Sequence, residues 1–280
     1  MSLFFHRLLP LIVLQLVLFQ CEGGSEEKVV HIPDPYFLEA LIEQGIDENG
    51  DGQISIPEAE NTQSIALGPS AISDLTGLNA FINLQALQIE MNPLSGLDIS
   101  SNTGLVHLEC TGCQLASLDV SSNSKLRYLD CSGGAALGNK LTALDLSLNP
   151  VLEFLNCAEN RITSLDVSKN SRLTTLDCGR NQIQVLDVSA NSNLTHLMVN
   201  NNLLISLDVS GKQNLQKLIT CGNQLLKLDV SANSKLKVLG VDNMSTITEV
   251  CVWTLPFPPA GVVVLKEFSP NVYFSLNCTF

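Results

Sequence analysis

The chain has 280 residues, of which 28 are Asp or Glu and 15 are Lys or Arg, and its formal net charge is −13. This length allows one or two ordinary domains with a sizeable core. Such an acidic surface repels nucleic acid and anionic lipid and suits cations or basic partners, so nucleic-acid binding is not expected.

The first twenty residues are typical of a secretory signal. Arg7 is followed by the apolar run LLPLIVLQLVLF, too short to span a bilayer comfortably, and by polar CEGGSEE. The segment LFQC resembles a bacterial lipobox, in which Cys21 would be lipidated, although Phe19 and Gln20 depart from the small residues usual there. We therefore expect residues 1–20 to be a signal peptide and 21–30 a polar linker. The protein would be an outer-membrane lipoprotein of a bacterial envelope, touching the membrane only through the lipid on Cys21, or else simply secreted.

Residues 31–63 are expected to form a small helical cap around a calcium loop. The segment DENGDGQISIPE (47–58) fits the EF-hand loop pattern. Asp47, Asn49 and Asp51 would supply side-chain oxygens, and Gln53 would supply its backbone carbonyl. Ser55 would hold a ligating water, and Glu58 would bind with both carboxylate oxygens.

The helices around this loop are short. The entering helix is predicted over PDPYFLEALIEQ with Asp34 as N-cap and Pro35 in the first turn, and the exit helix from Pro57 to about Asn61. Dockerin modules use a similar loop in duplicate, but no second loop is found here. The site is therefore predicted to be a structural calcium clip with an affinity of roughly 0.1–1 mM. The alternative is a loop that keeps the motif and binds nothing.

From Leu84 onward the sequence repeats with a period of 21 residues. Matching units begin at Leu84, Leu105, Leu126, Leu152, Leu173, Leu194 and Leu215, with a degraded unit at Leu236. One step is 26 residues, and its five extra residues, within CSGGAALGNKL between Cys131 and Leu141, are predicted to bulge outward as a loop. A fixed period in this range predicts a solenoid.

The units, such as LTTLDCGRNQIQVLDVSANSN (173–193), resemble short leucine-rich repeats, and SAISDLTGLNAFINL (70–84) is similar to the opening repeat of internalin-like bacterial proteins. The resemblance covers residues 64–245. It implies a leucine-rich repeat solenoid with a curved parallel β-sheet on the concave face and short strand or turn segments on the convex face. Residues 246–280 would form a β-rich C-terminal cap.

Two inward columns follow from this repeat. Cysteine alternates with Ile89 and Val199 at one strand position, so Cys110, Cys131, Cys157 and Cys178 are expected to be buried free thiols and not metal ligands. Asparagines are expected to satisfy backbone groups at a bend, with Cys113 as the exception: Asn92, Asn139, Asn160, Asn181, Asn202 and Asn223. Cys251 and Cys278 flank the non-repetitive tail and are expected to form a disulfide.

Outward columns supply the candidate partner surface. Tyr128 and Phe154 fall on adjacent strands, and the surface around them would comprise His107, Glu109, Tyr128, Asp130, Phe154, Asn156, Thr175, Asp177 and His196. The alternative is an ordinary solvated face with scattered aromatics. A separate column carries Asp98, Asp119, Asp145, Asp166, Asp187, Asp208 and Asp229, which would cap turns or, in a second interpretation, collect Ca²⁺.

For function we expect an exported, monomeric binding or adhesion protein that recognises a protein, or a surface glycan, through its concave face. The alternative is a passive structural component of the envelope or matrix. Catalysis is not expected, because the four histidines (His6, His31, His107 and His196) lie in no HExxH motif and the sequence lacks GxSxG and GxxxxGK. His107 beside Glu109 and Asp130 could in principle do acid–base work, but an open sheet excludes little water.

Overall fold

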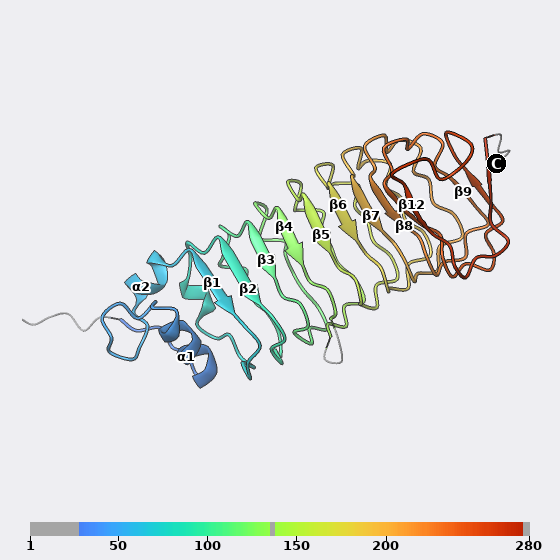
Figure 1. The fold of residues 1–280 in the computed structure, drawn as a ribbon. Coiled ribbons are helices and arrows are strands. Elements are labelled where there is room, and N and C mark those ends of the chain that lie inside the picture. The colour runs from blue at the N-terminus through green and yellow to red at the C-terminus, as the bar shows by residue number, and fades with distance from the viewer. Residues whose placement is uncertain (1–27, 135–137, 277–280) are drawn as a thin grey trace, which may run out of the picture.

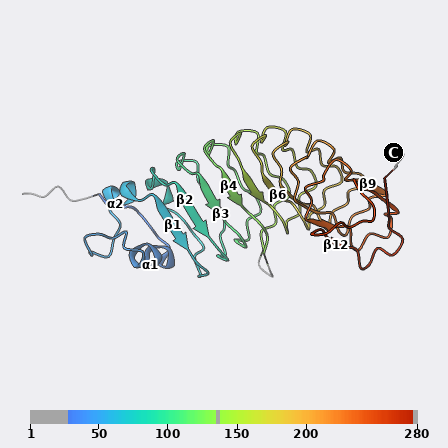
Figure 2. The ribbon, with the colours of Figure 1, turned by 45° about the horizontal axis from the view of Figure 1, so that its top comes forward.

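The computed structural model describes residues 28–134 and 138–276. The expected signal peptide, Cys21 and Cys278 lie outside these ranges. Over the described residues the chain winds into a curved solenoid, with two short helices at its N-terminal end (Figures 1 and 2). No helix in these ranges has the length and apolar character needed to cross a membrane.

The elements begin with α1 (Pro35–Glu43), α2 (Ile56–Asn61), β1 (Ser64–Leu67) and the 3-10 helix η1 (Leu78–Ala80). The strands of the repeats are β2 (Ala86–Ile89), β3 (His107–Glu109), β4 (Tyr128–Asp130), β5 (Phe154–Asn156), β6 (Thr175–Asp177), β7 (His196–Met198), β8 (Lys217–Ile219), β9 (Lys227–Asp229) and β10 (Val238–Gly240). Last come β11 (Glu249–Cys251), β12 (Val263–Leu265) and β13 (Tyr273–Ser275).

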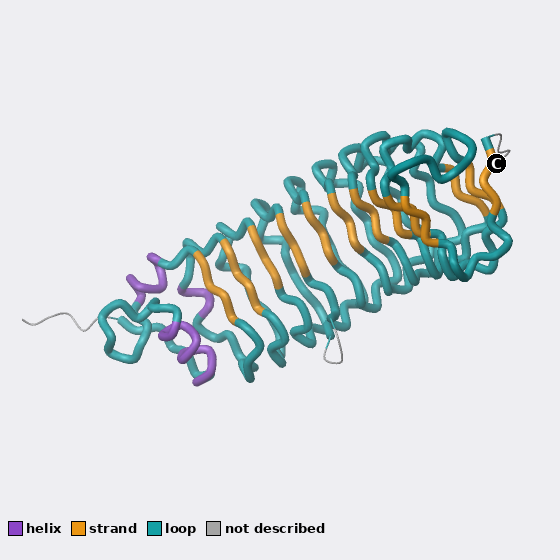
Figure 3. Tube along the Cα trace, in the orientation of Figure 1, coloured by secondary structure: helices purple, strands orange, loops and turns teal. Residues whose placement is uncertain are grey.

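One parallel sheet runs the length of the solenoid. Its ten strands lie in the order β1-β2-β3-β4-β5-β6-β7-β8-β10-β12. Figure 3 shows the strands in orange, side by side along the solenoid. The register pairs equal positions of successive repeats, so that Phe154 stands opposite Tyr128 on one side and Thr175 on the other. The middle residue of each strand from β3 to β8 and of β10 is buried, as the alternation of a strand demands. The predicted leucine-rich repeat solenoid is therefore confirmed.

The sheet is longer than the repeat count predicts, because strands lie outside the recognisable units at both ends. β1 pairs in register with β2, and β12 pairs in register with β10. β12 belongs to the tail that the sequence indicates as non-repetitive, and β11 and β13 of the same tail form a second parallel sheet with β9. The tail thus continues the coil, since parallel pairing with the last repeats satisfies its backbone groups.

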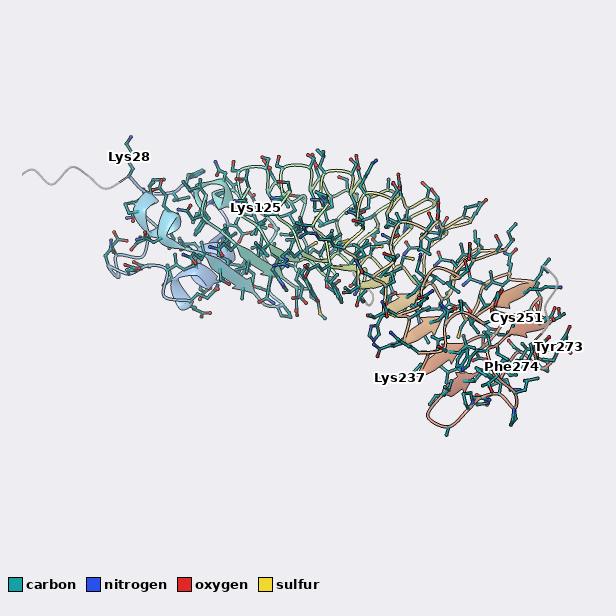
Figure 4. All side chains as sticks on the ribbon, turned by 90° about the horizontal axis from the view of Figure 1, so that it is seen from above. Lys28, Lys125, Lys237, Cys251, Tyr273 and Phe274 are labelled. Atoms are coloured by element: carbon teal, nitrogen blue, oxygen red, sulfur yellow. The ribbon has the colours of Figure 1, made fainter. Side chains whose placement is uncertain are left out.

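The C-terminal strands bring aromatic residues and Cys251 together (Figure 4). Val250 stands opposite Phe274 and Cys251 opposite Ser275 in the β11–β13 pair. Cys251 is disulfide-bonded. Its expected partner Cys278 lies outside the described residues, so that pairing stays a prediction.

The N-terminal helices add apolar side chains to the end of the repeat core. The Asp34 carboxylate accepts from the backbone N–H of Tyr36 and Phe37, which caps α1 as predicted. Phe37 and Leu41 are fully buried in the same cluster as the repeat leucines. Asp34 also accepts from the backbone N–H of Ser73, which ties the helix to the chain just after β1.

The predicted asparagine column forms a hydrogen-bond ladder that is interrupted at Cys113. The Nδ2 of Asn181 donates to the carbonyls of Cys157 (3.0 Å) and Cys178 (3.1 Å), and its Oδ1 accepts from the N–H of Ile162 (2.9 Å). Asn160 and Asn202 bind the equivalent groups on either side. Each side chain thus bridges two coils at the bend, where strand pairing ends.

Cys113 makes the ladder incomplete in the second repeat. Its Sγ donates to the Ile89 carbonyl at 3.1 Å, but a thiol offers only a weak acceptor in place of the amide oxygen. The N–H of Leu94, which would need that oxygen, binds the carbonyls of Asn92 and Cys113 instead.

A second asparagine column, not anticipated from the sequence, lies at the ends of the LDVS-type arms, with Lys212 in place of asparagine in one arm. In Asn191, Nδ2 donates to the carbonyls of Val167 (3.0 Å) and Asn170 (2.9 Å), while Oδ1 is buried with no hydrogen-bond partner. The same holds for Asn102, Asn123, Asn149, Asn170 and Asn233. Outside the Lys212 arm, the sequence repeats an Asn four residues after the Asp of each arm, as in Asp187 and Asn191. This spacing alone did not reveal that the Asn side chain points inward.

The cysteine column is buried as predicted. Cys110, Cys131, Cys157 and Cys178 are free thiols with at most 1% exposure. Burial raises the pKa of the Cys157 thiol, and the neighbouring Cys178 and Cys131 add to this effect. These residues act as small apolar fillers of the core.

Candidate functional site

The predicted calcium loop is closed by hydrogen bonds from both of its ends. The Oε1 of Glu58 accepts from the backbone N–H of Glu48 (2.8 Å) and its Oε2 from that of Ser55 (2.7 Å). At the other end, the Oδ1 of Asp47 accepts from Gly50 (2.8 Å) and its Oδ2 from Gly52 (2.9 Å). Gly52 has φ 81°, a left-handed conformation that favours glycine and turns the chain sharply.

The charge state of Glu58 suits a cation ligand. Burial alone would raise the pKa of this carboxyl, but hydrogen bonds from Ser55, Asn49 and Glu48 outweigh burial and lower the pKa. Glu58 is also nearly buried, at 7% exposure, and completes a capping box with Ser55 at the start of α2.

The loop offers oxygen donors of the kind that Ca²⁺ prefers, from Asp47, Asn49, Asp51 and Glu58 and from the Gln53 carbonyl, with Ser55 placed to hold a water. Over residues 28–134 and 138–276, no three His, Cys, Asp or Glu side chains converge as a metal would require. In this arrangement the acids bind backbone N–H groups of the loop. Calcium therefore stays a prediction, made from the donor set and the loop conformation.

The loop is also tied to the segment before α1. The N–H of Val30 donates to the Ile54 carbonyl (2.7 Å) and that of Ile56 to the Lys28 carbonyl (2.8 Å). Val29 and Ser55 form an antiparallel bridge. A cation that orders the loop would therefore also order this segment.

The second candidate site lies on the outward side chains of the ten-stranded sheet, which we call the sheet face. Its third-position column contains Ala86, His107, Tyr128, Phe154, Thr175, His196, Lys217 and Val238, and its fifth-position column Gln88, Glu109, Asp130, Asn156, Asp177, Met198, Ile219 and Gly240. All nine residues of the predicted partner surface lie in these two columns.

Three rings form a continuous stack on the sheet face. His107 and Tyr128 lie with ring centroids 4.1 Å apart and planes within 9°. Tyr128 and Phe154 lie 4.2 Å apart and within 2°. We call these residues the ring stack. Parallel strand spacing of about 4.8 Å places side chains of one column close enough to stack, so the repeat itself produces this arrangement.

Carboxylates line the ring stack on one side. Asp130 accepts from Thr111 Oγ1 (3.0 Å), Ser132 Oγ (2.6 Å) and Asn156 Nδ2 (2.8 Å), so its oxygens are well satisfied. Glu109 accepts from Gln88 Nε2 at 2.9 Å and lies 3.6 Å from His107 Nε2. The face therefore combines exposed ring edges with negative charge.

The Asp98–Asp229 column, by contrast, is engaged in turns. In each unit the Asp Oδ1 accepts from the backbone N–H of the serine two residues later, as in Asp166 with Ser168 (2.8 Å) and Asp187 with Ser189 (2.7 Å). This is the Asx-type turn expected from the sequence. Nothing in this geometry calls for the second interpretation, a row of calcium sites.

No protein-family model and no curated protein sequence matches the chain. Solved structures do. The functional domain of InlJ from Listeria monocytogenes, described as including a cysteine ladder, is 27% identical with a TM-score of 0.66 over 86% of this chain and 61% of its own. Internalin C2 from the same organism is 20% identical with a TM-score of 0.66 over 77% of this chain and 97% of its own.

A third similar structure is the leucine-rich repeat ectodomain of the plant receptor kinase GASSHO1/SCHENGEN3 from Arabidopsis thaliana, in complex with Casparian strip integrity factor 2. It is 20% identical with a TM-score of 0.51 over 71% of this chain and 31% of its own. The chain thus has the fold of internalin-like leucine-rich repeat proteins, and it spans less than two thirds of the InlJ chain. The fold is one used for protein binding or adhesion in general.

Proposed function

We propose that the chain is an exported binding or adhesion protein of a bacterial cell envelope. It recognises a protein partner, or a surface glycan, through the sheet face, and calcium bound in the 47–58 loop stabilises its N-terminal segment. Export is supported by the signal-like N-terminus, which lies outside the described residues, with lipidation at Cys21 or secretion as the two routes.

The observation that carries this proposal is the ring stack. His107, Tyr128 and Phe154 present partly exposed ring edges on an open sheet, next to Asp130 and Glu109. Aromatic residues beside charged groups are enriched where binding energy is concentrated in protein interfaces. A passive envelope component, the second candidate, has no need of such a patch.

The geometry favours binding over catalysis. The ring of His107 is stacked on Tyr128, and its Nε2 has no hydrogen-bond partner. The Nδ1 of His196 is paired with the Thr195 hydroxyl at 2.9 Å. Among the described residues neither ring is hydrogen-bonded to a carboxylate that would orient it, as a catalytic base commonly is.

The test is retention of the protein on intact bacterial envelopes, with and without EDTA. The double variant Tyr128→Ala/Phe154→Ala should lose at least about tenfold in binding, because each truncated hot-spot side chain costs about 1–2 kcal/mol. Ile205→Ala/Leu226→Ala is the matched control, because both side chains are exposed but lie outside the sheet strands. Equal retention of the two double variants would favour the passive component.

A further inference from the structure

The ring stack ends abruptly at Phe154. One face of its ring is covered by Tyr128, but the next residue in the column is Thr175, whose short side chain cannot extend the stack. Among the described residues no ring stacks on this second face. The following position is His196, about two strand spacings, or roughly 9.6 Å, from Phe154 along the sheet. Between the rings of Phe154 and His196 the column therefore carries only the short side chain of Thr175.

A carboxylate with spare acceptor capacity borders this gap. Asp177 is two residues after Thr175 on β6, so both side chains point to the same face. Its Oδ1 accepts from the N–H of Gly179 at 3.0 Å, and its Oδ2 has no partner among the described residues. Asp130, two strands away, has its oxygens filled by Thr111, Ser132 and Asn156.

The surroundings of Asp177 compensate its charge only in part. Burial raises the pKa of this carboxyl, and the hydrogen bond from Gly179 and the charge of Lys217 only partly oppose the effect. Arg180 is the cation nearest in sequence, but its guanidinium pairs with Glu159 at 3.6 Å. Asp177 also lines a hollow of about 580 Å³ together with the Glu159–Arg180 pair, and neither Phe154 nor Thr175 lines this hollow.

From these features we infer that the open face of Phe154, the Thr175 floor and the Asp177 carboxylate form a binding site for an arginine side chain of a protein partner. This inference rests on the proposed function, whose surface it uses. The guanidinium lies flat on Phe154 and continues the ring stack, and it donates hydrogen bonds in its plane to Asp177.

Arginine fits this site better than other groups with part of the same chemistry. A guanidinium is planar, stacks on aromatic faces and donates two parallel hydrogen bonds to a carboxylate, whereas a lysine ammonium is a strongly hydrated point charge. A neutral sugar could cover Phe154 but would leave the Asp177 charge uncompensated. The chain's net charge of −13 favours a basic partner segment.

The test compares two labelled Gly/Ser peptides that differ only in carrying arginines or lysines, by fluorescence anisotropy at about 0.15 M salt, where the Debye length is about 8 Å. The wild type should bind the arginine peptide at least about fivefold more tightly than the lysine peptide. Asp177→Asn and Phe154→Leu should each abolish this preference. Asn at position 177 can still accept from Gly179, which protects the fold. Asp187→Asn, in the turn column, is the matched control and should keep the preference.

Equal affinity for the two peptides would overturn the inference, as would an arginine preference that survives both Asp177→Asn and Phe154→Leu. Binding of the neutral sugar chitobiose, lost in Phe154→Leu, together with no arginine preference would assign the surface to glycans. If the preference is absent but Tyr128→Ala/Phe154→Ala still abolishes envelope retention, the proposed function stands and only the partner chemistry is wrong. If the wild type prefers the arginine peptide but Tyr128→Ala/Phe154→Ala leaves envelope retention unchanged, the proposed function fails instead.

Discussion

Replacing Asn181 with alanine is expected to destabilise the solenoid far more than any exposed substitution of the same kind. Its side chain is 8% exposed and serves two coils at once. The Nδ2 group donates to the carbonyls of Cys157, Cys178 and Gly179 at 3.0, 3.1 and 3.2 Å. Its Oδ1 accepts from the N–H of Ile162 at 2.9 Å.

The expected cost follows from these contacts. Two amide hydrogens shared among three carbonyls, together with the accepted bond, amount to about three hydrogen bonds of about 1 kcal/mol net each. Alanine also leaves the buried N–H of Ile162 without an acceptor, which adds about 1–3 kcal/mol. The free energy of unfolding should therefore fall by roughly 4–6 kcal/mol.

Two further variants test the physical reason. Asn181→Cys reproduces the arrangement of Cys113, whose thiol keeps one bond to a carbonyl, and should cost less than alanine. Asn193→Ala removes an exposed bond to the Ser171 carbonyl and should cost less than about 0.5 kcal/mol.

The assay is urea unfolding followed by far-UV circular dichroism and by fluorescence of Trp253, the single tryptophan, which lies near the C-terminal end. Coincident transitions justify a two-state free energy, a necessary check because repeat arrays can unfold in parts. A loss below about 1 kcal/mol for Asn181→Ala, with an unchanged m-value, would refute the reasoning, since the ladder would then add little to stability.

Three other outcomes are expected. Calcium at about 10 mM should raise Tm, because a dissociation constant near 0.3 mM corresponds to about 2 kcal/mol of stabilisation. Asp47→Asn should remove this rise in Tm, and the control Asp229→Asn should keep it. A rise in Tm in both variants would place the ion outside the 47–58 loop. The backbone N–H and hydroxyl of Ser168 lower the pKa of Asp166 below its ordinary 3.8, and Asp145 and Asp187 are lowered in the same way. The folded-state pKa of these carboxyls lies below the unfolded-state pKa, so their stabilisation is present above about pH 3.8 and is lost as pH falls through the folded-state pKa. A triple Asp→Asn variant should therefore show a smaller drop in Tm than the wild type between about pH 5 and about pH 2.5. An equal drop in Tm would contradict this. Burial raises the pKa of Cys110, Cys131 and Cys157 well above the ordinary thiol value, so Ellman's reagent should label these thiols only after denaturation. Half-buried Cys221 should react first. Rapid labelling of all four thiols in the native protein would show that the cysteine column is open to solvent.

The sequence determined the repeating features of this protein. Because successive units advance by 21 residues, with one step of 26, equal positions of the units share a column, and the alternation within a strand decides which columns face inward. This was enough to predict the buried cysteines, the asparagine ladder with Cys113 as its exception, and the side-by-side placement of Tyr128 and Phe154. The Asp34 cap of α1 was predictable as well, since it depends on neighbours in the chain.

Only the tertiary structure decided two kinds of feature. The first is the pairing of strands outside the recognisable repeats, and the second is the set of contacts that side chains make between neighbouring coils. The pairing of β12 with β10 could not be predicted, because Val263–Leu265 carries no repeat signature and its register is set by the strand beside it. The inward second asparagine column and its unpartnered Oδ1 atoms depend on how closely successive arms approach one another. The open face of Phe154 and the free oxygen of Asp177 likewise depend on how neighbouring coils approach one another. Periodicity fixes which residues are neighbours, whereas the atoms left without a partner are fixed by distances between coils.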